Sequence, residues 1–224
     1  MISRVLHLTS NRVPLIGLQR AFRRRNARIL TGWDIRVWSD ADNDALMNAQ
    51  FPQHVDVYRA LPHGVMRADV VRLVYMHALG GWYADTDYEW FKPPPLDRTA
   101  VLPYSRENML GNAVLGSEPG HPFWALALGA LFAQPELVDS TISQIEDRTG
   151  PGFMTRLLPD AQAFGDMWLA PRSYFHAPVT AASVDAFGVH HTRGSWRANP
   201  LRWKAEMTRR RVTRAVKRLL PGGG

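Results

Sequence analysis

The alternation of apolar and polar residues is clearest in residues 66–90. Apolar residues recur at helical spacing between Val70 and Ala78. Gly80 and Gly81 then predict the end of a helix, since the residue after a last helical turn often adopts a positive φ. The apolar residues 82–84 read as a short strand. This segment is therefore predicted to be a helix, a glycine break, a strand and an acidic turn, Asp85-Thr86-Asp87.

Similar segments lie on both sides of this central stretch. Predicted strands occupy residues 4–9, 34–38, 100–103, 110–115 and 167–171. Predicted helices span residues 14–26, 40–48 and 122–133; the first opens at Pro14, and the second is capped by Asp40. Alternation of strands and helices is typical of an α/β fold, with a central, mostly parallel sheet flanked by helices.

Composition limits the classes of protein and site that fit. A chain of 224 residues suits one domain with a full core. The absence of cysteine excludes disulfides and thiolate metal sites. The first ten residues lack the apolar run of a signal peptide, and the apolar run of residues 123–133 is too short to span a bilayer. These features predict a cytoplasmic protein.

The net charge of +7 is concentrated near the C-terminus, where residues 202–218 hold eight basic residues against Glu206. We therefore expect a main domain at 1–199 and a basic amphipathic tail at 200–224. Such tails bind anionic lipid, at about 1 kcal/mol per basic residue. The tail predicts peripheral contact with the inner face of the plasma membrane, with a solvated or disordered terminus as the alternative. Nucleic acid is not an expected partner, because the charge does not line a face of the fold.

Two carboxylates one residue apart at the end of a strand need a physical reason. In an extended segment Asp85 and Asp87 would point to opposite faces, but in a turn they can converge. Converging carboxylates repel each other unless a cation lies between them. Mg²⁺ binds one or two carboxylates together with substrate phosphates, and Mn²⁺ favours similar sites. The turn thus predicts a metal site for a phosphorylated ligand, and two solvated acids are the alternative.

The residues around the acidic turn resemble a known family. Ala68-Asp69, Arg72, Gly80-Gly81, Tyr83, Asp85 and Asp87 follow the spacing of the DXD region in glycosyltransferase family 32, which includes the fungal initiating α-mannosyltransferases. The glucosyltransferase domains of large clostridial toxins are similar in this region. The one departure is Ala68, where the family often has serine.

This resemblance implies a GT-A type, Rossmann-like fold and a retaining hexosyltransferase. It further implies a UDP- or GDP-sugar as donor, Mn²⁺ (or Mg²⁺) as cofactor, and a glycan or lipid-linked acceptor. Eukaryotic relatives usually carry a membrane anchor, so a chain without one resembles a bacterial member that acts in surface polysaccharide synthesis.

The resemblance also implies roles for residues near the turn. Asp87 would bind the metal, and Asp85 would contact the ribose and support the metal. Asp69 would accept hydrogen bonds from sugar hydroxyls, and Arg72 would pair with the donor or its diphosphate. Asn112 falls in a stretch that resembles the donor-sugar side of the family's pocket; a satisfied position in a sheet is an equal alternative.

A second cluster, residues 190–196, resembles the family's C-terminal H-x-x-x-x-S-W segment. By spacing, His190 is the candidate third metal ligand and His191 the less favoured one. Ser195 and Trp196 would hydrogen-bond the diphosphate. Without the resemblance, a surface histidine pair is the simpler interpretation.

Two other functions fit parts of the sequence. A phosphohydrolase can carry Asp-x-Asp at a strand end, with the first Asp as nucleophile. Such enzymes usually place the motif on the first strand and have Thr or Val two residues after it. In this chain the strand is central, and the residue at that position is Glu89. A non-enzymatic basic protein that binds membrane or nucleic acid is the other alternative.

Overall fold

The computed structural model describes residues 1–134, 141–177 and 184–191. They belong to one compact unit, Met1–Thr192. The predicted tail at 200–224 and the predicted boundary after residue 199 lie outside the described residues, so this division stays a prediction. Among the described helices, none has the length and apolar character needed to cross a membrane.

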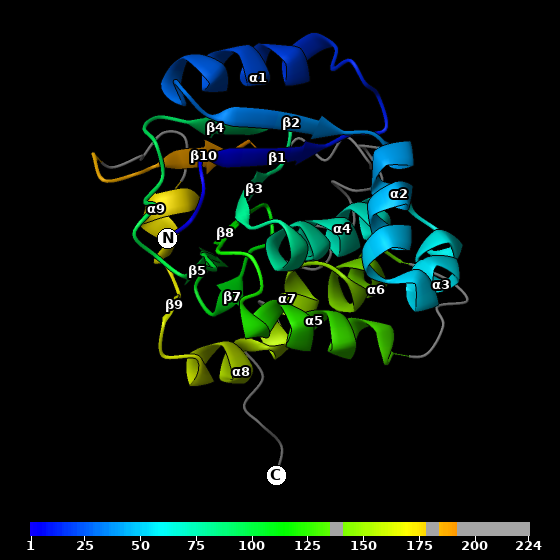
Figure 1. Cartoon of the computed structure of the whole chain (residues 1–224). Coiled ribbons are helices and arrows are strands. Elements are labelled where there is room, and N and C mark those ends of the chain that lie inside the picture. Colours follow the sequence, from blue (N-terminus) through cyan, green and yellow to red (C-terminus); the bar gives the residue numbers. More distant parts are fainter. Residues whose placement is uncertain (135–140, 178–183, 192–224) are drawn as a thin grey trace, which may run out of the picture. The chain divides into compact units, whose positions relative to one another are not determined.

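Six strands form the central sheet in the order β2–β1–β3–β8–β5–β9 (Figure 1). β1 runs parallel to β2 and β3, β5 runs parallel to β9, and β8 is antiparallel to β3 and β5. The predicted α/β fold with a mostly parallel sheet is confirmed. The strands are β1 Val5–Thr9, β2 Asp34–Trp38, β3 Gly81–Ala84, β5 Ala100–Val101, β8 Val114–Ser117 and β9 Met167–Trp168.

Two antiparallel strand pairs lie beside this sheet. One joins β6 (Tyr104–Arg106) to β7 (Met109–Leu110). The other joins β4 (Tyr88–Trp90) to β10 (Gly188–His190), with His190 opposite Tyr88. The second pair brings a histidine from the end of the described chain next to the acidic turn.

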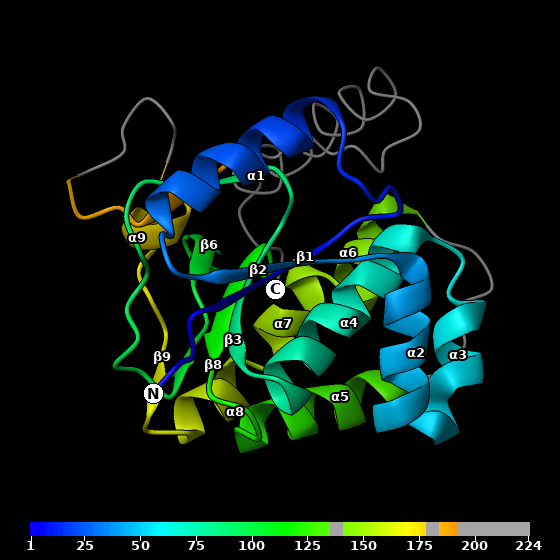
Figure 2. The same ribbon diagram turned by 45° about the horizontal axis from the view of Figure 1, so that its top comes forward.

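Helices flank the sheet on both sides. α1 contacts β4, whereas α4 contacts β1, β3 and β8 and lies beside α5 (Figures 1 and 2). The helices are α1 Gly17–Ile29, α2 Asp40–Gln50, α3 Val55–Ala60, α4 Gly64–Ala78, α5 Pro122–Phe132, α6 Ile142–Arg148, α7 Pro151–Arg156, α8 Leu158–Ala163 and α9 Arg172–Phe175, and a 3₁₀ turn, Pro52–His54, precedes α3.

Two hydrophobic clusters fill the space beside the sheet. The larger cluster surrounds α4, whose Val70, Val71 and Val74 are fully buried. A helix that is apolar on most sides must be covered on most sides. The smaller cluster contains Leu6 and Leu8 of β1 together with tryptophans of β3 and β4. The larger cluster thus anchors α4, and the smaller cluster anchors β3 and β4, the two strands that flank the acidic turn.

Three predicted element boundaries are wrong, each for a local reason. The first helix begins at Gly17 rather than Pro14, because the residue before it, Ile16, is extended. Ser39, not Asp40, caps α2. The Ser39 hydroxyl accepts a hydrogen bond from the Asp42 backbone amide, and the Asp42 carboxylate accepts one from the Ser39 backbone amide. The predicted strand at 110–115 is interrupted between β7 and β8, where the Gly111 amide bonds to the Pro103 carbonyl.

Candidate metal and donor site

The glycine break between α4 and β3 directs the chain into the acidic turn. Gly80 and Gly81 have φ values of +62° and +88°. A Cβ on Gly80 would lie 2.5 Å from the Pro119 nitrogen, and one on Gly81 would lie 2.8 Å from the Val5 carbonyl oxygen. The predicted helix stop is confirmed, and both positions require glycine.

Asp85, Asp87 and His190 converge on one point. Their ligand atoms all lie within 4.8 Å of one another. His190 Nε2 is 2.9 Å from Asp87 Oδ1 and 3.4 Å from Asp85 Oδ2. The backbone amide of Tyr88 donates to the Asp85 carbonyl at 2.9 Å and closes the turn. The structure therefore places both carboxylates on the same side of the turn, as predicted, and all three side chains remain partly exposed.

The charges of this cluster act on His190. Burial alone would lower the pKa of the imidazole, but the hydrogen bond to Asp87 and the negative charges of Asp85 and Asp87 outweigh burial and raise its pKa. A protonated His190 partly neutralises the two carboxylates. A divalent cation between the same three groups would do so more fully, with the imidazole in its neutral form.

Behind the acidic turn, Arg72 and Asp69 form a buried ion pair on α4. Arg72 Nη2 lies 3.0 Å from Asp69 Oδ1, and both residues are 4 % exposed. Arg72 Nη1 donates to the Asn112 carbonyl at 2.6 Å and lies 3.4 Å from Asp85 Oδ1. The guanidinium also packs over the Tyr83 ring, 4.7 Å from its centroid. Arg72 thus links the core of the protein to the acidic turn.

Asp69 is held by three donors. The Asn112 amide donates to Oδ1 at 2.9 Å, and the Thr149 hydroxyl donates to Oδ2 at 2.8 Å, in addition to the contact with Arg72. Burial raises the pKa of Asp69 to about 6, against the opposing effects of Arg72 and Thr149. The Asp69 carboxylate is therefore engaged in positioning Arg72 and Asn112.

Asn112 belongs to this network and not to a regular strand. It lies between β7 and β8, 6 % exposed, with its side chain on Asp69 and its carbonyl on Arg72. Asn112 is therefore not a position in a sheet, which was one of its two interpretations. A contact between Asn112 and the donor sugar stays a prediction.

His191 is held apart from the acidic cluster. Its Nε2 lies 2.8 Å from Glu89 Oε2, and its ring lies 4.7 Å from the Phe22 ring of α1. Glu89 also pairs with Arg25 at 2.8 Å. The Arg25 side chain remains 62% exposed in this pair. Of the two imidazoles, that of His190 meets the Asp87 carboxylate, whereas His191 contacts Asp87 through its backbone amide, which donates to the Asp87 carbonyl at 3.1 Å.

Sequence reasoning missed three supporting side chains: Tyr83, whose hydroxyl donates to Asp85 Oδ1 at 2.6 Å; Thr149; and Glu89. Thr149 begins a threonine-glycine-proline run at the start of α7, and this run was the available signal in the sequence. The predicted diphosphate-binding residues Ser195 and Trp196 lie outside the described residues.

Comparisons with known proteins show which sequences this chain resembles. Residues 19–107 match the family model described as "Glycosyltransferase sugar-binding region containing DXD motif". Inositol phosphoceramide mannosyltransferase 3 of Schizosaccharomyces pombe is 25% identical over 186 residues, covering 77% of this chain and 51% of that protein. Mannosyl phosphorylinositol ceramide synthase CSH1 of Saccharomyces cerevisiae is 28% identical over 121 residues, covering 53% of this chain and 32% of that protein. The chain thus spans about half or less of the length of these relatives.

A solved structure, PaToxG Glycosyltransferase, has a similar fold. The TM-score is 0.55 at 13% identity, with 73% of this chain and 70% of that chain covered. The predicted glycosyltransferase fold and the resemblance to DXD glycosyltransferases are both confirmed.

Proposed function

We propose that this chain, whose residues 19–107 match the model of a DXD-containing glycosyltransferase sugar-binding region, transfers a hexose from a nucleotide-diphosphate sugar to a lipid-linked or glycan acceptor. The observation that carries the proposal is the convergence of Asp85, Asp87 and His190 beside the buried cation of Arg72. Two carboxylates, an imidazole and a fixed guanidinium together suit a metal-bound diphosphate.

The three converging residues fit a divalent ion. Asp87 and His190 would hold it directly, and Asp85 would complete its support. Carboxylates suit both Mg²⁺ and Mn²⁺, but Mg²⁺ is usually bound through oxygen alone, so the imidazole nitrogen favours Mn²⁺. When bound, the ion would stabilise the negative charge that grows on the leaving nucleoside diphosphate.

The residues of the chain would orient the donor around that ion. Arg72, fixed by Asp69 and Asn112, would offer a planar cation to the donor or its diphosphate. Asp69 would act mainly by holding Arg72, and a direct bond from Asp69 to a sugar hydroxyl stays a prediction. Contacts of Ser195 and Trp196 with the diphosphate, and retention of anomeric configuration, also stay predictions.

The names of the two yeast relatives suggest a donor sugar and an acceptor class. Both are enzymes of inositol phosphoceramide mannosylation, as their names state. They favour mannose as the sugar and a membrane lipid with a phosphoinositol headgroup as the acceptor. A role in bacterial surface polysaccharide synthesis, a cytoplasmic location and membrane contact through the tail remain predictions of the sequence.

A thermal-shift panel tests the proposal. UDP, GDP and their sugars are added with and without Mn²⁺ to the wild type, to Asp87→Ala, and to a control, Asp97→Ala, whose side chain is 78% exposed. A ligand at about 100 times its dissociation constant adds about 2.7 kcal/mol to stability. We expect wild type and control to shift only when metal and one nucleotide are both present, and Asp87→Ala not to shift.

Turnover by the same variants completes the test. Asp87→Ala should lower kcat by about 10²–10³-fold, as loss of a preorganised charge stabiliser does elsewhere. A folded Asp87→Ala protein that keeps the nucleotide shift and the activity would defeat the assignment. Release of inorganic phosphate from simple phosphate esters would instead favour the phosphohydrolase alternative. No nucleotide shift in any protein would favour the non-enzymatic one.

A further inference from the structure

We propose that the outer face of α1, together with residues 12–18 at its N-terminal end, docks onto an anionic lipid surface. Residues 1–33 contain seven arginines and neither Asp nor Glu. The positive charge of the N-terminal segment is thus as strong as that of the tail. Five of these arginines lie on α1, Arg12 lies in the loop before α1, and Arg4 precedes β1.

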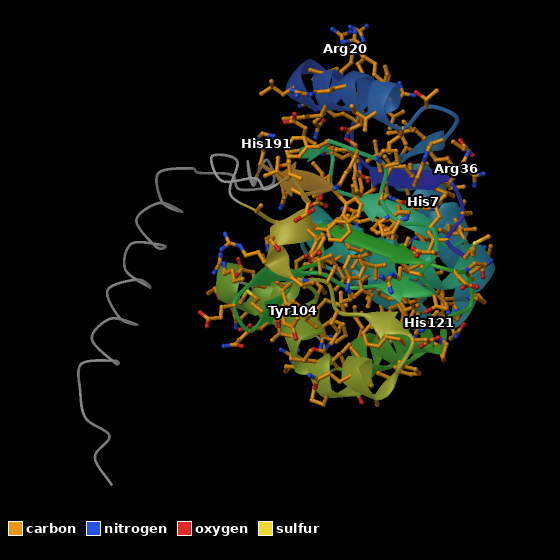
Figure 3. The ribbon with its side chains drawn as sticks, turned by 90° about the vertical axis from the view of Figure 1, so that its left-hand side faces the viewer. His7, Arg20, Arg36, Tyr104, His121 and His191 are labelled. Atoms are coloured by element: carbon orange, nitrogen blue, oxygen red, sulfur yellow. The ribbon has the colours of Figure 1, made fainter. Side chains whose placement is uncertain are left out.

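Three arginines of α1 share the side of the helix that faces away from the protein. Asn26 is 2% exposed and faces inward, where it hydrogen-bonds to the backbone of β4. Arg20, Arg24 and Arg28 follow one another at intervals of four residues, and all three are exposed. Figure 3 shows Arg20 projecting outward from the helix. The outer side of α1 is therefore a stripe of cations.

An apolar tip adjoins this stripe. Val13, Ile16 and Leu18 are 49%, 51% and 53% exposed, within six residues of sequence. Single exposed apolar residues are common on protein surfaces, but a group of three beside several arginines is the composition that interfacial segments use. The apolar side chains would enter the boundary between headgroups and acyl chains, while the arginines bind lipid phosphates. Charge complementarity thus selects an anionic bilayer as the occupant.

The inner face of the same helix touches the acidic turn. The Gln19 side chain donates to Thr86, the middle residue of Asp85-Thr86-Asp87, at 2.9 Å. Phe22 packs against His191, and Arg25 pairs with Glu89. A docked α1 would therefore hold the candidate site close to the headgroups, where a lipid-linked acceptor would lie. Docking itself does not depend on catalysis and can be tested without it.

The test is co-sedimentation of the full chain with phosphatidylcholine vesicles, with and without phosphatidylglycerol. The α1 charge variant is Arg20→Glu/Arg24→Glu. Its control, Arg59→Glu/Arg106→Glu, makes the same change in net charge at exposed residues of α3 and β6. The apolar variant is Ile16→Ser/Leu18→Ser. Its control is Val57→Ser/Leu126→Ser, which alters residues that are each 38% exposed.

We expect the wild type to bind vesicles with phosphatidylglycerol and to lose binding at high salt. The α1 charge variant should bind at least about tenfold more weakly, since each basic residue near such a surface contributes about fivefold. The apolar variant should also bind more weakly, and both controls should bind within about twofold of the wild type.

Two results would overturn the proposal: a wild type that does not bind the anionic vesicles, or an α1 charge variant that binds as its control does. In the second case the contact belongs to another basic segment, such as the tail. Unchanged far-UV circular dichroism and melting temperature show that each variant is folded. The nucleotide- and Mn²⁺-dependent thermal shift reports separately on the donor site, so failure of docking and failure of the proposed transferase function can be told apart.

Discussion

At the scale of single residues, the candidate site depends on a buried charge that is supported from several segments. Asp69 and Arg72 are each 4% exposed, and an ion pair at that depth is costly unless its remaining polar atoms are satisfied. Asn112 and Thr149 supply that satisfaction from positions 43 and 80 residues away in the sequence. The position of Arg72 beside Asp85 thus depends on hydrogen bonds from outside the motif.

Replacing Thr149 by valine should reveal this dependence. Valine keeps the shape of the side chain but leaves Asp69 Oδ2 without its donor, while Thr149→Ser keeps the hydroxyl. Loss of a donor to a buried acceptor costs about 1–3 kcal/mol. We therefore expect urea denaturation to show Thr149→Val destabilised by this amount and Thr149→Ser by clearly less. A Thr149→Val variant that is no less stable than Thr149→Ser would contradict the supporting role of the hydroxyl.

The parts of the site that the sequence predicts are those whose contacting residues lie close together along the chain. Asp85 and Asp87 share one turn, so local spacing was sufficient to predict that they converge. His190 came from a resemblance in spacing, and the pairing of β10 with β4 explains how it reaches Asp87. Tyr83 acts locally, two residues before Asp85, whereas Thr149 and Glu89 act on partners that are 80 and 102 residues away and that only the folded chain brings together.

At the scale of elements, the turn between α4 and β3 sets the direction of the acidic segment. Gly80→Ala would combine a positive φ with a Cβ that lies 2.5 Å from the backbone of Pro119. Gly32→Ala is the matched control, because Gly32 has φ +78° with open space around the added Cβ. A positive φ alone costs an L-residue about 1–2 kcal/mol.

We expect Gly32→Ala to lose that amount in chemical denaturation and Gly80→Ala to lose clearly more, because the segment at Pro119 must also move. The displaced turn should weaken metal-dependent nucleotide binding in Gly80→Ala alone. If the two variants lost the same stability, the close approach to Pro119 would be easily relieved and the turn would be less constrained than the structure indicates.

A second element-scale link joins α1 to β4. The Asn26 amide donates to the Tyr88 carbonyl, and the Trp90 amide donates to Asn26 Oδ1, each at 2.9 Å. Asn26→Ala removes both hydrogen bonds and leaves the Tyr88 carbonyl and the Trp90 amide unsatisfied. This should lower the free energy of unfolding by about 2–4 kcal/mol. The control Asn48→Ala, at an exposed position of α2, should be close to neutral. Urea midpoints that coincide for the two variants would contradict the proposed link.

The elements themselves were predicted better than their ends. Apolar periodicity identified the helix at α4, the first two strands and the helix at α5, because burial of one face dominates these segments. The interruption of residues 110–115 was not predicted. Gly111 and Asn112 leave the strand pattern to meet Pro103, Arg72 and Asp69, and tertiary contacts of this kind override local preference.

At the scale of the whole molecule, the central strand β1 carries a buried histidine that ties stability to pH. His7 is 0% exposed. Its Nε2 lies 2.9 Å from the Gly80 carbonyl, and its Nδ1 accepts from the Trp38 indole at 3.1 Å. These bonds assign the proton to Nε2 and leave no room for a second proton on Nδ1. Burial lowers the pKa of His7 to about 4, despite the bond to Gly80.

This lowered pKa predicts a loss of stability in mild acid. The unfolded chain gains a proton on His7 below pH 6.5, whereas the folded protein gains it only near pH 4. Unfolding therefore binds a proton between these values, and the free energy of unfolding should fall as the pH falls through this window. The pKa difference corresponds to about 2–3 kcal/mol by pH 4.5.

Comparing the wild type with His7→Gln isolates this effect. Glutamine can still donate to the Gly80 carbonyl but does not titrate. Asp69, whose pKa is raised to about 6, titrates in the opposite sense, but it is present in both proteins and cancels in the comparison. Urea denaturation at pH 7 and pH 4.5 should show the wild type losing about 2–3 kcal/mol more than the variant. Equal losses of stability in the wild type and the variant would mean that His7 is already protonated in the folded state at pH 4.5. The bond from Trp38 to Nδ1 would then break in acid without lowering the stability of the protein.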